Sequence, residues 1–392
     1  MSHIGIFTYS TKPRGSVVHA ACLGEALTRA GYDVTLFALD RGGQGFFREL
    51  DCNVCLLPAA EAPAELDQLI RQRIGEFVSG LQAQAPRLDL LHAQDCLASN
   101  ALLEVRTAGA LSISSCPLLR TVHHVERFES AYLLDCQRRS ILEADLLLSV
   151  SEATEQAVRA EFGRHSQRVP NGVELERFHA LGPQRRRLLR QRLGFDPRDF
   201  VVLSVGGIEG RKNSLRSLAA VSRLAEAGAR VSWVVLGGAS ILDHRAYREG
   251  FDAALAALSP LVRERVRLRG PVSDAELCEW YQASDVLLCP SEQEGWGLCV
   301  LEAMAAELPV VVADRAPFTE YVTERAGLLV DPTDVSAIER ALALLAADPE
   351  LCRRLGQGGL QIAARHSWAR SAALHGEQYQ RALQHALGRA AS

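Results

Sequence analysis

The chain has 392 residues, of which 48% are hydrophobic and 23% charged, and its formal net charge is −4 at pH 7. These values are typical of a globular protein, and the length allows two domains with separate cores. Neither half is basic enough to indicate nucleic acid as a partner or strong attraction to anionic lipid. The sequence contains no apolar run long enough to cross a bilayer, which leaves only peripheral membrane contact open.

The cysteines and the first residues bear on the compartment. No signal peptide is expected, since the first strand-like run begins at Ile4 without a basic lead or a cleavage site. The ten cysteines lack the spacing of a disulfide framework, so we expect reduced thiols in a cytoplasmic protein. Cys52 and Cys55 form a single C-x-x-C pair, and no second pair or nearby His completes a metal site. We therefore expect neither a metal nor a cofactor.

Strand-like and helix-like segments alternate through the first half of the chain. The predicted strands are Ile4–Tyr9, Asp33–Leu39, Val54–Pro58, Leu88–His92, Leu119–His123 and Leu146–Ser151. Between the first two, apolar residues of Val17–Ala30 recur at helical spacing. This alternation predicts a doubly wound, Rossmann-like α/β domain with a parallel sheet.

Three residues of this half stand next to the ends of predicted strands. Ligands of parallel sheets bind beyond the carboxyl ends of the strands, which makes His92 and His123 candidate site residues. A single histidine at a strand end is nevertheless more often structural. Gly15 follows the first strand and precedes the first helix, where a ligand can approach the backbone. The G-x-G-x-x-G pattern of a dinucleotide site is missing there.

Lysine is rare in this chain, because Lys12 and Lys212 are the only lysines among 43 basic residues. A compact ammonium suits phosphate as a point charge in a tight site. Both lysines follow a predicted strand in a segment that contains glycine. Lys212 stands in Val205–Asn213, directly after Arg211, and an ordinary solvated turn is the alternative interpretation.

The second half repeats the strand–helix alternation. Its predicted strands are Phe200–Val205, Val231–Gly237, Val266–Arg269, Val286–Cys289, Val310–Ala313 and Gly327–Val330. The preceding Gly182–Asp199 contains the basic run Arg185–Arg187, which we interpret as a solvated helix face near a domain link. We expect a second Rossmann-like domain over residues 181–369, following a first one over residues 1–180.

The segment Asp285–Asp314 is the most informative part of the sequence. It reads as strand, polar loop, helix and strand, the order of a parallel βαβ unit. Glu294 lies in the loop and Glu302 about one turn into the helix. The helix N-terminus between them suits phosphate, and the carboxylates can accept hydrogen bonds from hydroxyls. The combination predicts a site for a nucleotide sugar, although a Glu near a helix start also occurs for electrostatic reasons alone.

This segment resembles the E-x7-E motif of retaining GT-B glycosyltransferases, in particular glycosyltransferase family 4. The matching pieces are Pro290-Ser291, Glu294-Gly295-x-Gly297-Leu298, Leu301-Glu302-Ala303-Met304-Ala305 and Pro309-Val310-Val311. The resemblance implies a GT-B fold, in which two Rossmann-like domains face a cleft. It also implies that the C-terminal helix, about 370–392, packs back on the first domain. The implied activity is metal-independent transfer of a sugar, with retention, from a UDP- or GDP-type donor to an unknown acceptor hydroxyl.

The resemblance also implies roles for single residues. Lys212 would clamp the donor diphosphate, Glu294 would hold the donor sugar, and His123, from a T-x-H element, would approach that sugar. The implied donor-binding residues are Gly15, Gly207, Arg211, Gly295, Trp296, Gly297, Leu298, Cys299 and Glu302, the last of these holding the ribose. His92, in an H-A-Q-D element, would lie nearer the acceptor.

The chain departs from the family pattern at three places. Gly207 replaces an arginine that binds diphosphate in many members. Glu307 replaces a common glycine, and we expect it to keep an ordinary backbone conformation. The loop 316–320 lacks a common glycine pair, which leaves the donor sugar open.

Other functions remain compatible with these motifs. A nucleotide-sugar 2-epimerase would act on the donor without an acceptor. A sugar phosphorylase with pyridoxal phosphate would need a Schiff-base lysine, for which the second half offers only Lys212. A non-catalytic nucleotide-sugar-binding protein would explain the departures at Gly207 and residues 316–320.

Overall fold

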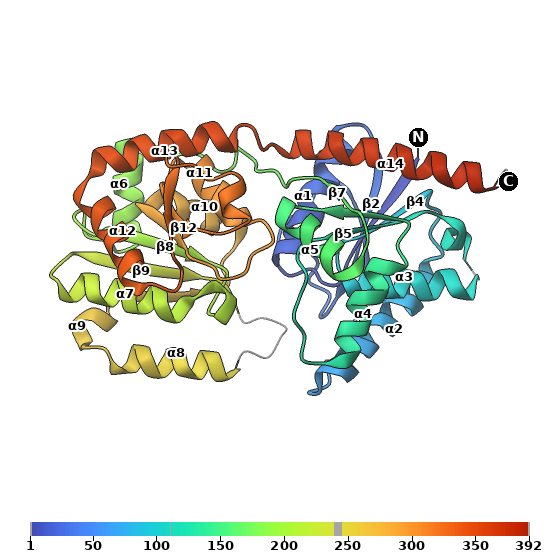
Figure 1. The fold of residues 1–392 in the computed structure, drawn as a ribbon, viewed down its shortest axis with the longest axis horizontal. Coiled ribbons are helices and arrows are strands. Elements are labelled where there is room, and N and C mark those ends of the chain that lie inside the picture. The colour runs from blue at the N-terminus through green and yellow to red at the C-terminus, as the bar shows by residue number, and fades with distance from the viewer. Residues whose placement is uncertain (1, 110, 239–244, 391–392) are drawn as a thin grey trace. The chain divides into compact units, whose positions relative to one another are not determined.

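The computed structural model describes residues 2–109, 111–238 and 245–390, and the chain forms two compact units (Figure 1). Unit 1 comprises Met1–Asn171 together with Trp368–Ser392, and unit 2 comprises Gly172–Ser367. The chain therefore leaves unit 1 after residue 171, where the sequence suggested residue 180. Residues 391–392 of the expected C-terminal helix lie outside the described residues.

Unit 1 is built on a parallel seven-stranded sheet in the order β3-β2-β1-β4-β5-β6-β7. Its strands are β1 (His3–Thr8), β2 (Asp33–Asp40), β3 (Asn53–Pro58), β4 (Leu90–Ala93), β5 (Leu118–Val122), β6 (Leu146–Ser149) and β7 (Gln167–Arg168). In the register of the sheet, Ile6 lies between Leu36 and His92. The short β7 has no counterpart among the predicted strands, because its two residues are polar and exposed.

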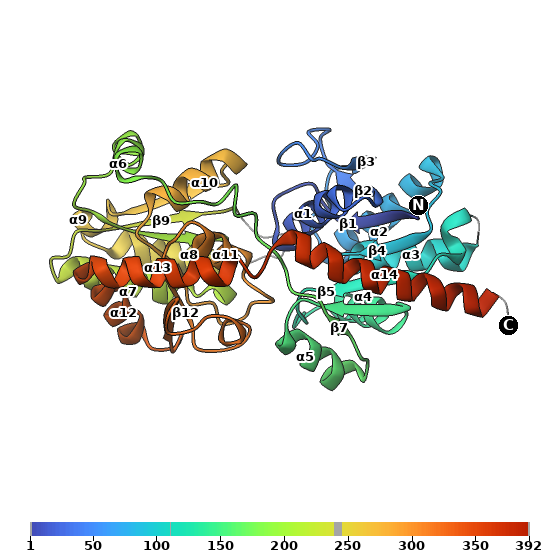
Figure 2. The ribbon, with the colours of Figure 1, turned by 90° about the horizontal axis from the view of Figure 1, so that it is seen from above.

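Several helices of unit 1 begin at a polar side chain that caps them. The helical segments of this unit are α1 (Gly15–Arg29), α2 (Leu66–Gln84), α3 (Cys96–Ala108), the 3₁₀ turn η1 (Ser112–Ser115), α4 (Ala131–Leu142), α5 (Glu152–Phe162) and α14 (Trp368–Ala390). The side chains of Asp95, Ser130 and Ser151 accept backbone N–H bonds at the starts of α3, α4 and α5. The last helix, α14, packs against α1, as Figures 1 and 2 show.

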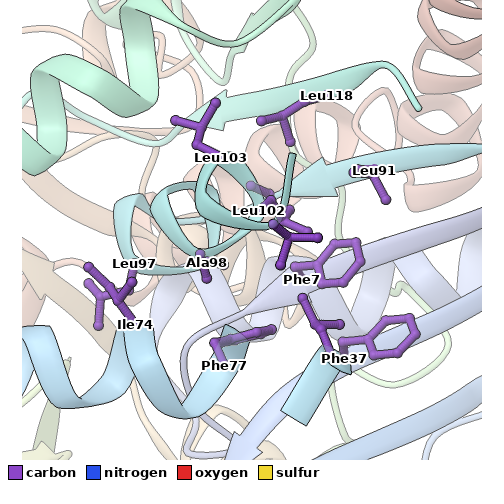
Figure 3. Packing of buried hydrophobic residues seen from close by; sticks show 14 of the residues in the cluster. Phe7, Phe37, Ile74, Phe77, Leu91, Leu97, Ala98, Leu102, Leu103 and Leu118 are labelled. Carbon is purple, nitrogen blue, oxygen red and sulfur yellow. The ribbon is translucent and has the colours of Figure 1, made fainter. Parts of the chain in front are cut away.

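A hydrophobic core of unit 1 lies between the sheet and helices α2 and α3 (Figure 3). Phe7 of β1 and Phe37 of β2 stack with their ring centroids 4.8 Å apart. Phe77 of α2 packs beside them, 6.3 Å from Phe7. These contacts fix β1 and β2 against α2. The turn before Gly15 follows β1.

Unit 2 has a parallel six-stranded sheet in the order β10-β9-β8-β11-β12-β13. The strands are β8 (Phe200–Val205), β9 (Val231–Leu236), β10 (Val266–Gly270), β11 (Val286–Cys289), β12 (Val310–Ala313) and β13 (Gly327–Val330). The helical segments are α6 (Pro183–Arg192), η2 (Gly210–Lys212), α7 (Ser214–Glu226), α8 (Arg245–Ala257), α9 (Pro260–Arg263), α10 (Asp274–Ala283), α11 (Leu298–Ala305), η3 (Phe318–Glu320), α12 (Val335–Ala347) and α13 (Pro349–Ala363).

The basic run of α6 is only partly a solvated face. Arg185 and Arg187 are exposed as expected. Arg186 instead donates to Asp285 at 2.6 Å, and Arg190 adds a second bond to the same carboxylate at 3.0 Å. The helix is thereby fixed to the start of β11, since Asp285 immediately precedes that strand.

Strand order reverses in unit 2 between β8 and β11, which are neighbours in the sheet although β9 and β10 lie between them in sequence. The carboxyl ends of two such strands form a topological switch point, where doubly wound sheets bind ligands. The loop after β8 carries Lys212, and the loop after β11 carries Glu294. The two parallel sheets with flanking helices confirm the predicted α/β fold of two doubly wound domains.

Candidate nucleotide-sugar site

An ion pair joins the two loops at the switch point of unit 2. The Lys212 ammonium donates to Glu294 Oε2 at 2.5 Å, and the two side chains are only 13% and 14% exposed. Arg211 Nη1 lies 3.6 Å from Glu294 Oε1, while its Nε lies 2.9 Å from a carboxylate oxygen of Glu209. Two cations and two carboxylates thus converge at the end of β8.

Two glycines before Lys212 leave room for this arrangement. Gly206 has φ +127°, and a Cβ built on it would lie 2.8 Å from Cε of Lys212. Gly207 has φ +81°, and a Cβ there would lie 2.6 Å from the carbonyl oxygen of Gly238. A side chain at 207 is therefore excluded by conformation and by contact. The backbone of this chain therefore has no room for the arginine that many members of the family carry at this position.

The charge of Lys212 is set by two opposing effects. Burial disfavours the ammonium, but the nearby carboxylate of Glu294 outweighs it and raises the pKa of Lys212 above its ordinary value. The side chain therefore remains protonated at neutral pH. An ammonium has three donor hydrogens, so Lys212 can keep Glu294 and still bind a phosphate oxygen.

Asn213 fixes the loop that carries Lys212. It adopts a left-handed conformation with φ 58°, which asparagine tolerates better than most residues. Its amide Nδ2 donates to the carbonyl oxygens of Pro290, at 3.2 Å, and Pro332, at 2.5 Å. The loop after β8 is therefore tied to the loops after β11 and β13.

The loop after β11 ends at the N-terminus of α11. Gly297 is the N-cap with φ +91°, a conformation that suits glycine, and Leu298 and Cys299 are the first helical residues. The first N–H groups of a helix lack partners within it and attract phosphate. The backbone N–H of Glu292 donates to the carbonyl of Arg211 at 2.8 Å, which holds this loop against the first. Gly295, between Glu292 and Gly297 in sequence, is buried.

The side chain of Trp296, which the resemblance implies to bind the donor, is buried in unit 2. It is 5% exposed and stacks on Tyr321, with ring centroids 4.8 Å apart. The Tyr321 hydroxyl also donates to the Trp296 carbonyl at 2.9 Å. The indole ring thus supports the loop from inside unit 2 and presents little surface to a donor.

Glu302 lies one turn into α11, as predicted, and a tyrosine holds it. The hydroxyl of Tyr281, on α10, donates to Glu302 Oε2 at 2.7 Å. Burial raises the pKa of Glu302, while the bond from Tyr281 and the charge of Arg177 act in the opposite direction. Sequence reasoning missed Tyr281, because an aromatic residue in an amphipathic helix is indistinguishable from a core residue.

Two cysteines flank the same site. Cys289 ends β11 and Cys299 is in the first turn of α11. The Cys299 thiol donates to the sulfur of Cys289, which lowers the pKa of Cys289 to about 7 against the effect of burial, with help from Lys212. Cys289 Sγ also lies 3.4 Å from the Ser291 hydroxyl.

The expectation for Glu307 was wrong. This residue has φ 58° and not an ordinary helical or extended conformation. The N–H of Glu307 donates to Met304 O at 3.1 Å, and that of Leu308 donates to Ala303 O at 2.9 Å. These two bonds form a Schellman motif, which ends α11 and requires a left-handed residue at 307.

In unit 1, His123 follows β5 and has partly buried surroundings. Its Nε2 lies 3.2 Å from Gln94 Oε1, and its ring centroid lies 4.8 Å from that of His19. Burial, with the neighbouring His19, lowers the pKa of His123 well below its ordinary value. A neutral imidazole therefore stands at the carboxyl end of the sheet.

His92, which the resemblance places nearer the acceptor, has its hydrogen-bond partners within unit 1. It is fully buried in unit 1. Nδ1 lies 2.8 Å from the hydroxyl of Tyr379 on α14, and Nε2 lies 2.7 Å from the hydroxyl of Thr121. Both ring nitrogens are occupied, so His92 links α14 to the sheet.

Gly15 is the first residue of α1, is exposed, and would accept a Cβ with no atom within 4 Å. No described residue of unit 1 thus excludes a side chain at this position. Among the described residues, no three His, Cys, Asp or Glu side chains are grouped so as to hold a metal ion. Within the same described part of the chain, no helix combines the length and hydropathy required to span a membrane.

Comparisons with known proteins identify the family of the chain. Residues 185–361 match the family described as Glycosyl transferases group 1, and residues 13–177 match Glycosyltransferase Family 4. A D-inositol 3-phosphate glycosyltransferase of Xylanimonas cellulosilytica is 30% identical over 393 aligned residues, covering 92% of this chain and 89% of that protein.

Solved structures show the same fold. A sucrose-phosphate synthase from Thermosynechococcus elongatus has a TM-score of 0.81 at 22% identity, covering 97% of this chain and 99% of that one. Anabaena HepE, in complex with UDP and glucose, has a TM-score of 0.76 at 19% identity, covering 97% and 100%. With these matches and the two doubly wound units, the chain belongs to the family 4 (group 1) glycosyltransferases of the GT-B fold.

Proposed function

We propose that this chain is a retaining glycosyltransferase that moves a sugar from a nucleotide diphosphate sugar to an acceptor hydroxyl without a metal ion. The observation that carries the proposal is the partly buried Lys212–Glu294 pair at the switch point of unit 2. It places a fixed cation beside the N-terminus of α11, where a diphosphate finds both charge and N–H donors.

Each part of the donor has a proposed partner. Negative charge builds on the diphosphate as its bond to the sugar breaks, and Lys212 with the first N–H groups of α11 would stabilise it. Glu302 would accept bonds from the ribose hydroxyls. Glu294 would hold the sugar. The family resemblance also implies a sugar-facing role for His123.

The proposed chemistry needs no nucleophile from the protein. The leaving phosphate would take the proton of the acceptor hydroxyl, which attacks from the same face of the sugar. Lys212 and Arg211 would supply the positive charge that a metal ion supplies in other transferases. The family resemblance supports this route.

The donor is proposed to be of the UDP or GDP type, with UDP first. Support comes from Anabaena HepE, whose structures contain UDP or UDP-glucose. The acceptor is an open choice among hydroxyl compounds. Phosphorylated inositol is the first to try, since several relatives are named for it at about 30% identity.

Thermal unfolding with UDP, GDP and ADP, followed by nucleotide release from their sugar conjugates, tests the proposal. We expect one nucleotide class to raise the unfolding temperature, and release to depend on an acceptor. No stabilisation by any of the three would contradict the proposal. Conversion of the donor alone to an isomer would instead identify an epimerase, and binding without turnover across many acceptors would identify a binding protein.

A further inference from the structure

We propose that Tyr281 is a positioning residue that holds the Glu302 carboxylate in the orientation that accepts the ribose hydroxyls of the donor. This inference rests on the proposed function, because it requires Glu302 to contact ribose. Tyr281 itself touches neither the sugar nor the diphosphate in this assignment. Its effect on the ligand passes through Glu302.

The hydroxyl of Tyr281 has one hydrogen and two acceptors within reach. Glu302 Oε2 lies at 2.7 Å and the carbonyl oxygen of Cys299 at 3.3 Å. The shorter bond to a charged acceptor takes the hydrogen. This hydrogen bond goes to Oε2 of Glu302, so Tyr281 does not contact Oε1.

The tyrosine is itself held firmly. Its side chain is fully buried, and the Phe178 ring meets it edge-on, with centroids 5.5 Å apart and planes at 88°. Helix α10 begins with a capping box between Ser273 and Glu276, and its first residue, Asp274, is bound by Arg177. A donor fixed in this way favours the rotamer of the flexible glutamate that accepts from it, because a hydrogen bond to a charged carboxylate is stronger than one to the Cys299 carbonyl.

The bond also favours the carboxylate over the neutral acid. Burial alone would favour protonated Glu302, whose O–H would be a donor and a poorer partner for two ribose hydroxyls. The hydrogen bond from Tyr281 and the nearby charge of Arg177 both act against protonation. The same contact therefore orients the carboxylate and opposes its protonation.

Calorimetric titration with UDP and with 2′,3′-dideoxy-UDP tests the role, since the analogue has no ribose hydroxyls for Glu302 to hold. Wild type should prefer UDP. Tyr281→Phe keeps the ring and removes the hydroxyl. It should weaken the binding of UDP roughly 3- to 10-fold, the range of one hydrogen bond, while the affinity for dideoxy-UDP changes little. Adding Tyr281→Phe to Glu302→Ala should have no further effect on UDP.

Tyr321→Phe is the matched control. It removes another buried tyrosine hydroxyl from unit 2, one that bonds to the backbone of Trp296 and not to Glu302. Any loss it causes should be equal for the two ligands. If Tyr281→Phe also weakens both equally, or if its effect adds fully to that of Glu302→Ala, Tyr281 has a merely structural role and the inference is overturned.

The outcomes separate this inference from the proposed function. Wild type that binds no nucleotide diphosphate overturns both. Wild type that prefers UDP to the dideoxy analogue, with a Tyr281→Phe variant that keeps the same preference, overturns only the role of Tyr281. Should Tyr281→Phe not fold, 3-fluorotyrosine at position 281 keeps the shape and strengthens the donor. An unchanged ratio of the two affinities in that protein would refute the inference.

Discussion

Removing the ammonium of Lys212 while Glu294 stays should lower both the stability of the protein and its affinity for nucleotide diphosphates. Breaking a buried ion pair from one side typically costs about 3–5 kcal/mol, because a charge is left buried and unpaired. Here the two side chains are 13% and 14% exposed, and Arg211 remains 3.6 Å from Glu294. We therefore expect Lys212→Met to lower the free energy of unfolding by about 2–3 kcal/mol.

The partner substitution should recover much of this loss. In the double variant Lys212→Met with Glu294→Gln no unpaired carboxylate remains, so about 1–2 kcal/mol should return in urea denaturation. Lys12→Met is the matched control, since Lys12 is the other lysine and is exposed in unit 1. It should change stability by no more than about 0.5 kcal/mol. A double variant as unstable as Lys212→Met would refute the buried-pair account.

The two residues of the pair should have different effects on UDP binding and on sugar transfer. Lys212→Met should weaken UDP by about 1.5–3 kcal/mol, the range for a hydrogen bond to a charged group, or roughly 10- to 150-fold. Glu294→Gln should leave UDP affinity nearly unchanged and lower the rate of sugar transfer, because Glu294 is assigned to the sugar. Equal loss of UDP binding and of transfer in Glu294→Gln would contradict that assignment.

Three further predictions concern backbone, pH and metal. Gly207→Ala should destabilise the protein by more than about 2 kcal/mol in urea denaturation, because the new Cβ would meet the Gly238 carbonyl. Gly228 also has a positive φ, but a Cβ there would have no atom within 4 Å, so Gly228→Ala should cost only about 1 kcal/mol. Burial, with the charge of His375, lowers the pKa of His19 to about 3, and burial lowers the pKa of His375 to about 4. Below pH 6.5 the unfolded chain therefore binds more protons than the folded protein. Stability should thus be full above that pH and fall toward pH 4, by up to about 1.4 kcal/mol per unit for each histidine, and a flat profile would rule this out. Sugar transfer should survive a chelator in excess, whereas restoration of lost activity by added Mg²⁺ would show that the metal-independent mechanism is wrong.

Much of the fold follows directly from the sequence. The strands β11, β12 and β13 have the bounds expected from their apolar runs, because parallel strands buried on both faces are nearly continuous in apolar residues. The two-residue β7 gave no such signal. The Schellman motif at Glu307 was also hidden, since the sequence offers a residue there that normally avoids the left-handed region.

The site was predictable in its chain positions but not in its contacts. Lys212 and Glu294 are 82 residues apart, and only the strand order, which places β8 beside β11, brings them together. Burial could not be foreseen for His92, whose partner Tyr379 lies on a helix 287 residues away. The same holds for Tyr281, because its bond to Glu302 depends on how α10 packs beside α11.

The central claim is that Lys212 binds the diphosphate of the donor in unit 2. Calorimetric titration of UDP, UMP and uridine into wild type and Lys212→Met tests it most directly, because the three ligands differ only in phosphate. The account predicts that the variant loses affinity for UDP far more than for uridine. Equal losses for UDP and uridine, or no loss for either, would contradict it.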